Sequence, residues 1–143
     1  MRHRMAVAVC ALLGLLVSAY LLLYKLGVFG RLLCAGSGGC ERVQLSRWSV
    51  MLGVPVAAYG VVGYLALLVI ALFGLQPGQL ASPGPTRWLA GLSALGVLYS
   101  VYLLAIELVS VHAVCIWCSV SGVLILVIFA VSTGALLGVS RTP

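Results

Sequence analysis

Five cysteines are the residues of this chain with the clearest potential for chemistry, and four of them form two closely spaced pairs. Cys34 and Cys40 flank the segment Ala-Gly-Ser-Gly-Gly, and Cys115 and Cys118 stand in Cys-Ile-Trp-Cys. The glycines would let the first pair close a small disulfide loop and also move. Thiol–disulfide exchange requires a thiolate aligned with a disulfide sulfur, so a mobile pair suits an electron carrier.

The second pair has the spacing that puts both sulfurs on one face at the start of a helix. Unpaired backbone N–H groups and the positive end of the helix dipole stabilise a thiolate there and make the pair reactive. The two pairs together predict a relay, in which a loop pair accepts electrons and a helical pair passes them on. Cys10 lies in an apolar run without a neighbouring cysteine, and we expect it to be a small packing residue.

Two other uses of four cysteines remain as alternatives. A structural zinc site would use four thiolates, but the spacings of five and two residues come without supporting histidines or carboxylates. Two static disulfides would suit an oxidising face, although a helical Cys-x-x-Cys is an unusual choice for a static bridge. We therefore expect no metal at these cysteines.

The composition predicts that these pairs belong to a membrane protein. The 143 residues are 64% hydrophobic and 7% charged, whereas a soluble domain has about half and about a quarter. So few charged side chains cannot give the chain a water-facing surface. The eight Lys and Arg are spread along the chain rather than clustered, so the formal charge of +6 does not predict nucleic-acid binding.

Four uncharged stretches are long enough to cross about 30 Å of hydrocarbon, and we find no β-alternation. They predict a single-domain all-α membrane protein over residues 1–143, a four-transmembrane-helix bundle with a long redox-active extracytoplasmic first loop. Pro55 is expected in the first turn of the second span, and the Pro- and Gly-rich residues 76–85 are expected to break the chain after it. We expect the first span to be a retained anchor rather than a cleaved signal peptide. The expected spans are about 5–25, 55–75, 88–107 and 114–138, with the redox loop at about 27–54.

Four spans put both termini on one side of the membrane, and the first loop and the 108–114 turn on the other. This parity is what would bring the two cysteine pairs to one face. The basic residues divide four against four between the sides, so the positive-inside rule does not decide the orientation. Arg2 and Arg4, at the start of the chain, favour cytoplasmic termini.

The motifs resemble those of the vitamin K epoxide reductase family, in its short bacterial form without a fused thioredoxin-like domain. The resemblance covers most of the chain, and it depends on the combination of motifs rather than on any one of them. DsbB-type oxidases also have four helices, but their Cys-x-x-Cys lies in the first loop, and here the order is reversed. The matching segments are Cys34-x5-Cys40, Glu-Arg-Val-Gln-Leu-Ser-Arg-Trp-Ser at 41–49, Leu-Gly-Val-Pro at 52–55, Tyr-Gly at 59–60 and Cys115-Ile-Trp-Cys118, with Ser18-Ala-Tyr-Leu and Glu107 fitting as well.

The resemblance implies an integral-membrane thiol oxidoreductase that uses a quinone, ubiquinone or menaquinone, as electron acceptor. A separate thioredoxin-like protein would be oxidised on the extracytoplasmic side of a bacterial plasma membrane, supporting disulfide bond formation. By the family's scheme Cys34 meets the partner, Cys40 attacks Cys115, and Cys118 faces the quinone. A quinone or vitamin K epoxide reductase that uses thiols as reductant would need the same residues.

Several side chains are candidates for binding the quinone. Ser46 matches the family's loop serine, whose hydroxyl can hydrogen-bond a quinone oxygen. Trp48, Tyr59 and Trp117 are aromatic candidates, as is Tyr64. Aromatic residues near membrane interfaces are, however, commonly belt residues.

Glu107 supports an alternative of another class. A carboxylate near a span is a functional candidate, and a small multidrug-type transporter would use one. We expect Glu107 to stand at the end of its helix, where it reaches water, whereas a proton-coupled carboxylate should lie deeper. His112 in the following turn could shuttle protons near neutral pH.

Overall fold

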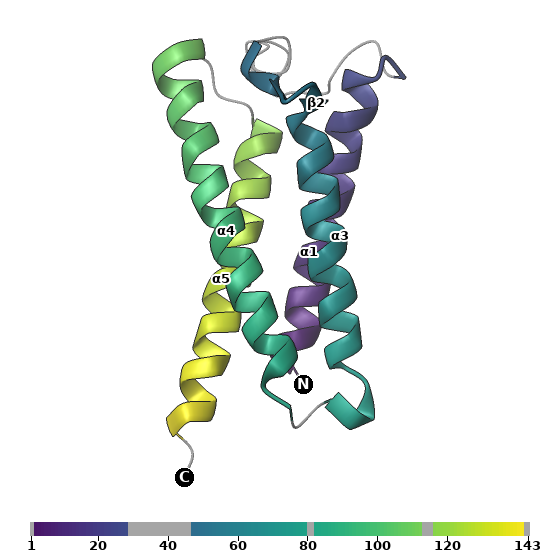
Figure 1. Cartoon of the computed structure of the whole chain (residues 1–143), viewed down its shortest axis with the longest axis vertical. Helices are drawn as coiled ribbons and strands as arrows, with labels where there is room; N and C mark the ends of the chain where they lie inside the picture. Colours follow the sequence, from purple (N-terminus) through teal and green to yellow (C-terminus); the bar gives the residue numbers. More distant parts are fainter. Residues whose placement is uncertain (1, 29–46, 80–81, 113–115, 142–143) are drawn as a thin grey trace.

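Four long helices run side by side in the computed structural model, which describes residues 2–28, 47–79, 82–112 and 116–141 (Figure 1). Each contains a stretch that is long and apolar enough to cross a membrane. The prediction of an all-α membrane protein with four spans is thereby confirmed. Most of the expected first loop, residues 29–46, lies outside the described residues. The helices are α1 (Arg2–Lys25), α3 (Val56–Gly74), α4 (Gly84–Ile106) and α5 (Ile116–Arg141).

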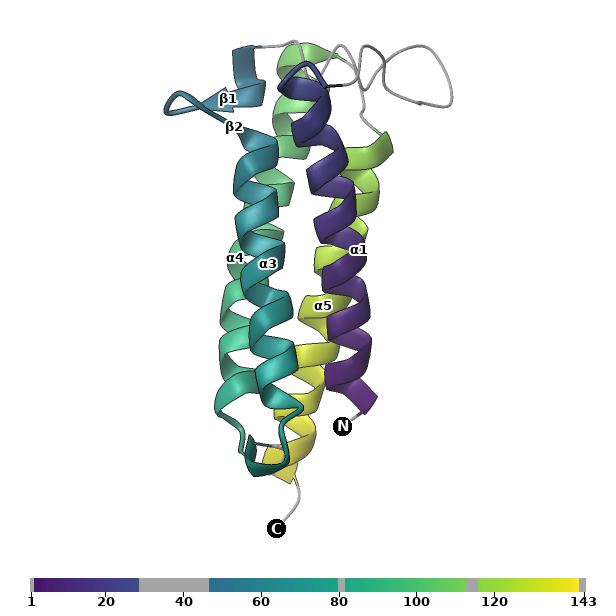
Figure 2. The same cartoon turned by 90° about the vertical axis from the view of Figure 1, so that its right-hand side faces the viewer.

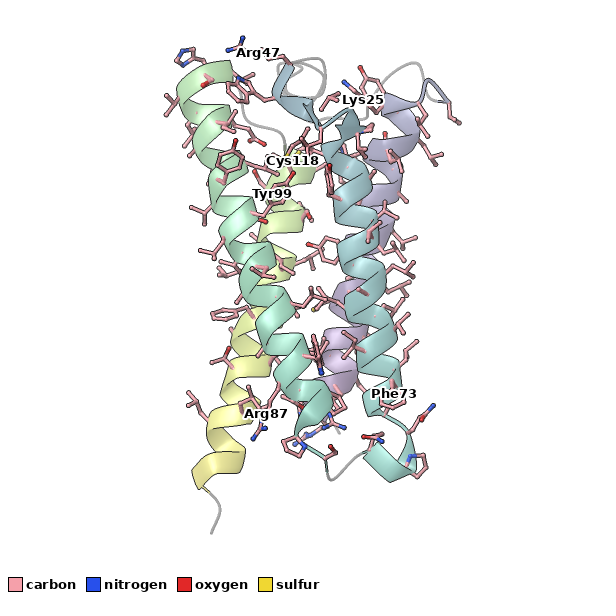
Figure 3. The ribbon with its side chains drawn as sticks, in the orientation of Figure 1. Lys25, Arg47, Phe73, Arg87, Tyr99 and Cys118 are labelled. Atoms are coloured by element: carbon pink, nitrogen blue, oxygen red, sulfur yellow. The ribbon has the colours of Figure 1, made fainter. Side chains whose placement is uncertain are left out.

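The described ends of the helices separate into two groups. Both termini lie at one end of the bundle, with the link between α3 and α4 that contains the short 3-10 turn η2 (Pro77–Gln79) (Figure 1). Lys25, Arg47 and the start of α5 lie toward the opposite end (Figure 3). The chain segments that border residues 29–46 and 113–115 therefore share one end, as the parity of four spans requires.

Helix α1 packs closely on α3 through small residues spaced four apart. Gly14 of α1 faces the ring of Tyr64, and an added Cβ at Gly14 would overlap that ring. Gly60 of α3 faces Ser18, whose Oγ would lie 2.7 Å from an added Cβ. Such small-xxx-small spacing is typical of membrane helices, because it lets two backbones approach. Figure 2 shows the two helices side by side along their length.

A core formed by all four helices fills the half of the bundle nearer the termini. Its fully buried members include Val7 of α1, Leu67 of α3, Leu89 of α4 and Ile128 of α5. Cys10 is partly buried and packs against this core, which agrees with its expected role as a packing residue.

Arg4 holds the terminal end of the bundle together. Its side chain is buried. The guanidinium donates hydrogen bonds to three backbone oxygens, that of Gly74, that of Gln79 at 2.7 Å and that of Ser82 at 2.6 Å. It also donates to the side-chain Oγ1 of Thr86 at 3.2 Å. A positive charge at the carboxyl end of α3 also complements the helix dipole. Arg4 thus ties the start of α1 to the link between α3 and α4.

Helices α3 and α4 begin at other residues than the sequence predicts, and prolines lie at both starts. Helix α4 begins at Gly84 rather than near residue 88, with Pro83 at its N-cap and Pro85 in its first turn. Proline lacks an N–H, but the first turn of a helix leaves that group unpaired anyway. Pro55 stands directly before α3 rather than inside its first turn.

A small hairpin precedes α3, although the sequence showed no β-alternation. After the 3-10 turn η1 (Arg47–Ser49), strand β1 (Val50–Met51) pairs antiparallel with β2 (Val54–Pro55). Leu52 and Gly53 form the turn with positive φ angles of 54° and 78°, as a two-residue hairpin turn requires. Strands of two residues are too short to show a periodic pattern.

Candidate functional site

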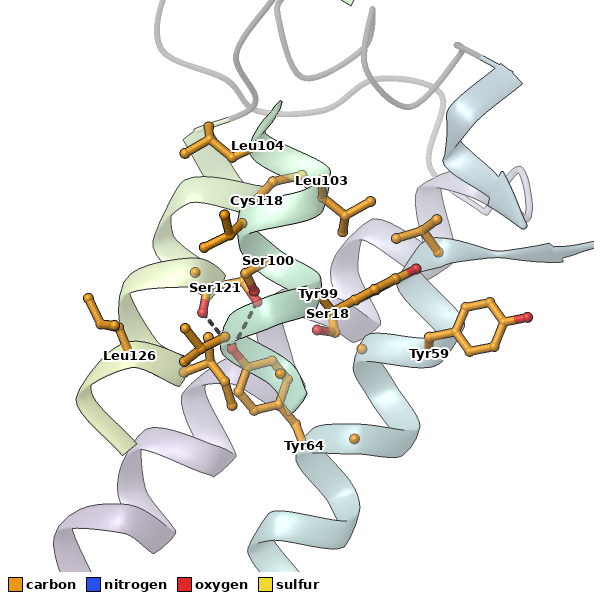
Figure 4. Close-up of a pocket in the computed structure, with 18 of the residues that line it drawn as sticks. Ser18, Tyr59, Tyr64, Tyr99, Ser100, Leu103, Leu104, Cys118, Ser121 and Leu126 are labelled. Atoms are coloured by element: carbon orange, nitrogen blue, oxygen red, sulfur yellow. Dashed lines mark hydrogen bonds between the residues drawn. The ribbon is translucent and has the colours of Figure 1, made fainter. Parts of the chain in front are cut away.

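A cavity of about 560 Å³ lies between the four helices in the half of the bundle nearer the hairpin (Figure 4). All four helices contribute to its lining, with Ser18 and Leu21 coming from α1. Most of the lining is apolar, with a few hydroxyl groups, one thiol and one carboxyl group. Its size and character are those of a small-molecule site.

Cys118 is the sequence-predicted redox residue that the structure describes, and it lines this cavity. It lies in the first turn of α5 and packs against the small buried cluster of Leu21 and Ala57. Backbone N–H groups at a helix start favour a thiolate, so the position suits a reactive sulfur. The other three predicted redox cysteines, Cys34, Cys40 and Cys115, lie outside the described residues.

The predicted quinone contacts divide between the cavity and its surroundings. Tyr59 lines the cavity, and its hydroxyl donates to the backbone oxygen of Met51 at 3.0 Å. Trp48 is 38% exposed beside the hairpin, with the guanidinium of Arg47 5.0 Å from its ring centroid. Trp117 lies outside the cavity lining, edge-on to Tyr20 with ring centroids 5.4 Å apart. Ser46 lies outside the described residues.

Tyr64 crosses the bundle from α3 to α5. Its side chain is 5% exposed, and its hydroxyl donates to the backbone oxygen of Ser121 at 2.6 Å and lies 2.9 Å from Ser121 Oγ (Figure 4). The ring rests on Gly14 of α1. Tyr64 therefore fixes three helices around the cavity.

Four polar residues of the cavity were missed by sequence reasoning: Tyr99, Ser100, Ser119 and Ser121. A helical pattern could have found two of them. Small or polar residues recur at helical spacing along α4 and into the turn that follows it, at Ser93, Gly96, Ser100 and Glu107. On α5, Cys118 and Ser121 are three residues apart. Small and polar residues on one face of an apolar helix indicate the side that faces its neighbours.

Glu107 is 5% exposed and lines the cavity, so the expectation that it reaches water is wrong. The helix does not end at Glu107, because a π-helical turn, η3 (Glu107–Val111), continues it. The turn ends at His112, which adopts a left-handed φ of 56°. The extra turn leaves the carboxyl group inside the bundle, and π-helical turns are frequent at functional sites.

No group of three or more His, Cys, Asp and Glu side chains able to hold a metal ion occurs within the described residues. Three of the four cysteines considered for zinc lie beyond those residues. The absence of a metal at the cysteines therefore stays a prediction.

The sequence model of the vitamin K epoxide reductase family matches residues 5–133 of the 143. The matched range contains all five cysteines, the hairpin and every residue of the cavity lining. With the four apolar helices, the match supports an integral membrane oxidoreductase of the quinone or vitamin K epoxide reductase type. The chain belongs to the vitamin K epoxide reductase family.

Proposed function

We propose that this protein is a quinone-linked membrane thiol–disulfide oxidoreductase that oxidises a separate thioredoxin-like partner. One observation carries the proposal. In a chain of this family, the second cysteine of the Cys-x-x-Cys motif lines an apolar cavity between four membrane helices (Figure 4). Such a cavity suits a quinone, which is apolar apart from its carbonyl oxygens.

The proposed route passes electrons from the partner through the two cysteine pairs. The partner's dithiol is oxidised to a disulfide as it reduces the Cys34–Cys40 disulfide. The Cys40 thiolate then attacks Cys115, which opens the Cys115–Cys118 disulfide and releases the thiolate of Cys118. Cys34 in turn attacks Cys40, which re-forms the Cys34–Cys40 disulfide and releases Cys115, so that Cys115 and Cys118 are left as a reduced pair. Two electrons and two protons from this pair convert quinone to quinol, and the disulfide forms again. The resemblance of the motifs supports this order, as does the common end shared by the segments that border residues 29–46 and 113–115.

The chain's own groups around the cavity have distinct tasks in this scheme. The amino end of α5 stabilises the thiolate of Cys118. The apolar walls exclude water from the reacting sulfur. Glu107, buried in the lining, is placed to relay protons between the cysteine pair and the quinone oxygens.

We place the protein in a bacterial plasma membrane, with cytoplasmic termini and the cysteine pairs on the extracytoplasmic side. Arg2 and Arg4 at the terminal end support this orientation. The surrounding lipid supplies the quinone, either ubiquinone or menaquinone. The extracytoplasmic side of such a membrane is oxidising, which is the condition under which disulfide bonds persist.

The test uses the purified full chain, a reduced thioredoxin-like protein and a short-chain quinone, with quinone absorbance as the signal. Wild type and Cys10→Ala should reduce quinone at similar rates, since Cys10 packs against the core and is not one of the residues that line the cavity. Cys118→Ala should abolish the reaction. Equal rates for Cys118→Ala and wild type would overturn the proposal.

A second candidate is the reaction for which the family is named. Reduction of vitamin K epoxide by thiols gives the quinone, a disulfide and water, and the same cysteines would perform it. Supplying the epoxide with a dithiol and measuring quinone formation separates the two directions. The transporter alternative predicts uptake that needs Glu107 and ignores every cysteine, whereas the match to an oxidoreductase family favours redox chemistry.

A further inference from the structure

Three tyrosines line the cavity, and they differ in where the hydroxyl hydrogen is directed. The hydroxyl of Tyr59 donates to the backbone oxygen of Met51 at 3.0 Å. The hydroxyl of Tyr64 donates to the backbone oxygen of Ser121 at 2.6 Å. The hydroxyl of Tyr99 is buried and has no hydrogen-bond partner within the described part of the chain.

A buried hydroxyl without a partner is unfavourable, and native proteins pair nearly all such groups. Tyr99 comes from the second half of α4 and extends its ring across the cavity toward α1 and α3 (Figure 4). Its ring and that of Tyr102, three residues along the helix, are stacked with centroids 6.4 Å apart. The hydroxyl therefore lacks an acceptor within the described residues, and a molecule bound in the cavity that Tyr99 lines can supply one.

A quinone presents acceptors only, in the form of its two carbonyl oxygens. Binding one in an apolar cavity therefore requires a donor from the protein. Tyr59 and Tyr64 have already directed their hydrogens at backbone oxygens, so they are not available without breaking those bonds. Of the three tyrosines that line the cavity, Tyr99 is the one whose hydroxyl donates no hydrogen bond within the described residues.

We propose that Tyr99 donates a hydrogen bond to a carbonyl oxygen of the bound quinone and so orients the quinone in the cavity that Cys118 lines. This inference rests on the proposed function. Tyr99 acts as a neutral donor and loses no proton to the quinone. Because the carbonyl oxygen gains negative charge as the quinone accepts electrons, the hydrogen bond strengthens during the reaction. Tyr99 thus contributes to both quinone affinity and the rate of reduction.

The variant Tyr99→Phe removes the hydroxyl and keeps the ring, and Tyr102→Phe is its matched control. Tyr102 lies on the same helix, is 46% exposed and does not line the cavity. For a short-chain ubiquinone we expect Tyr99→Phe to bind about tenfold more weakly, equivalent to about 1.4 kcal/mol. Tyr102→Phe should bind as wild type does. The carbonyl stretching band of bound ubiquinone should shift to higher frequency in Tyr99→Phe alone.

Thermal unfolding without quinone separates this role from a structural one. Removing an unpartnered hydroxyl should leave Tyr99→Phe at least as stable as wild type, while the stabilisation that added ubiquinone gives should shrink. A hydroxyl that merely holds the bundle together would instead lower the stability of the quinone-free protein when lost, and that result would overturn the proposal.

Different results would refute the role of Tyr99 and the proposed function. If wild type binds and reduces ubiquinone while Tyr99→Phe matches Tyr102→Phe in affinity and in carbonyl frequency, the role of Tyr99 is refuted and the proposed function stands. If wild type neither binds nor reduces ubiquinone, the proposed function itself is refuted, together with the role of Tyr99.

Discussion

Gly14→Ala is expected to destabilise the bundle although it adds a single methyl group. The new Cβ would overlap the ring of Tyr64. That ring cannot easily withdraw, because its side chain is 5% exposed and its hydroxyl is bonded to Ser121 on α5. Overpacking a well-filled core costs about 1–3 kcal/mol. We expect a loss in the upper part of that range, because the crowded atoms belong to a rigid ring.

Denaturation in detergent, followed by the loss of helical signal, measures the loss. Gly91→Ala is the matched control, since Gly91 is an exposed helical glycine with no heavy atom within 4 Å of an added Cβ. It should be neutral or mildly stabilising, because alanine is the better helix former. Equal stability of the Gly14→Ala and Gly91→Ala proteins would refute the packing argument.

A double-mutant cycle shows whether the loss comes from this contact. Tyr64→Leu removes the crowded ring, so Gly14→Ala should cost less in that background than in wild type. We expect a coupling free energy of about 1 kcal/mol or more. Additive effects would mean that the two residues do not meet as the structure has them. Because Tyr64 also lines the cavity, Gly14→Ala should weaken quinone binding as well.

Four further predictions concern other parts of the bundle. Arg4→Met should lower stability by about 3 kcal/mol or more in thermal unfolding, because backbone oxygens at the α3–α4 link lose a charged donor; an unchanged melting temperature would contradict this. Gly96→Ala should cost about 1 kcal/mol, less than Gly14→Ala, since the added Cβ would lie 2.7 Å from Cγ1 of Ile125, a smaller overlap than the one between Gly14 and the Tyr64 ring, and a cost above that of Gly14→Ala would refute the ranking. Glu107→Gln should slow quinone reduction by roughly tenfold or more at unchanged quinone affinity, and an unchanged rate would exclude its role in proton supply. Cys10→Ala should keep the wild-type rate and change stability by about 1 kcal/mol at most; a lost rate would place Cys10 in the redox chemistry.

The four spans were predictable because the length and apolarity of a segment are local properties of the sequence. Helix ends were less predictable, because they depend on which backbone groups find partners. The prolines before α4 looked like breakers, yet Pro85 fits the first turn of the helix. Glu107 looked like the end of a helix, yet a π-helical turn extends the chain past it and keeps the carboxyl group buried.

The candidate site was predictable only where the spacing of residues along the sequence indicates their chemistry. Cys-x-x-Cys predicts a reactive pair from sequence, and of this pair the structure describes Cys118, which lines the cavity. The roles of the tyrosines were not predictable, because they depend on which oxygen each hydroxyl meets across the bundle. Tyr59 and Tyr99 look alike in the sequence, but one hydroxyl has a backbone partner and the other has none within the described residues.

The central claim is that Cys118 passes electrons to a quinone held in the cavity between the four helices. The most direct test mixes pre-reduced protein with a short-chain ubiquinone under anaerobic conditions and follows quinol formation together with thiol loss in a single turnover. Wild type and Cys10→Ala are expected to lose two thiols for each quinol formed, while Cys118→Ala forms no quinol in this phase. Quinol formation by Cys118→Ala at the wild-type rate would contradict the claim.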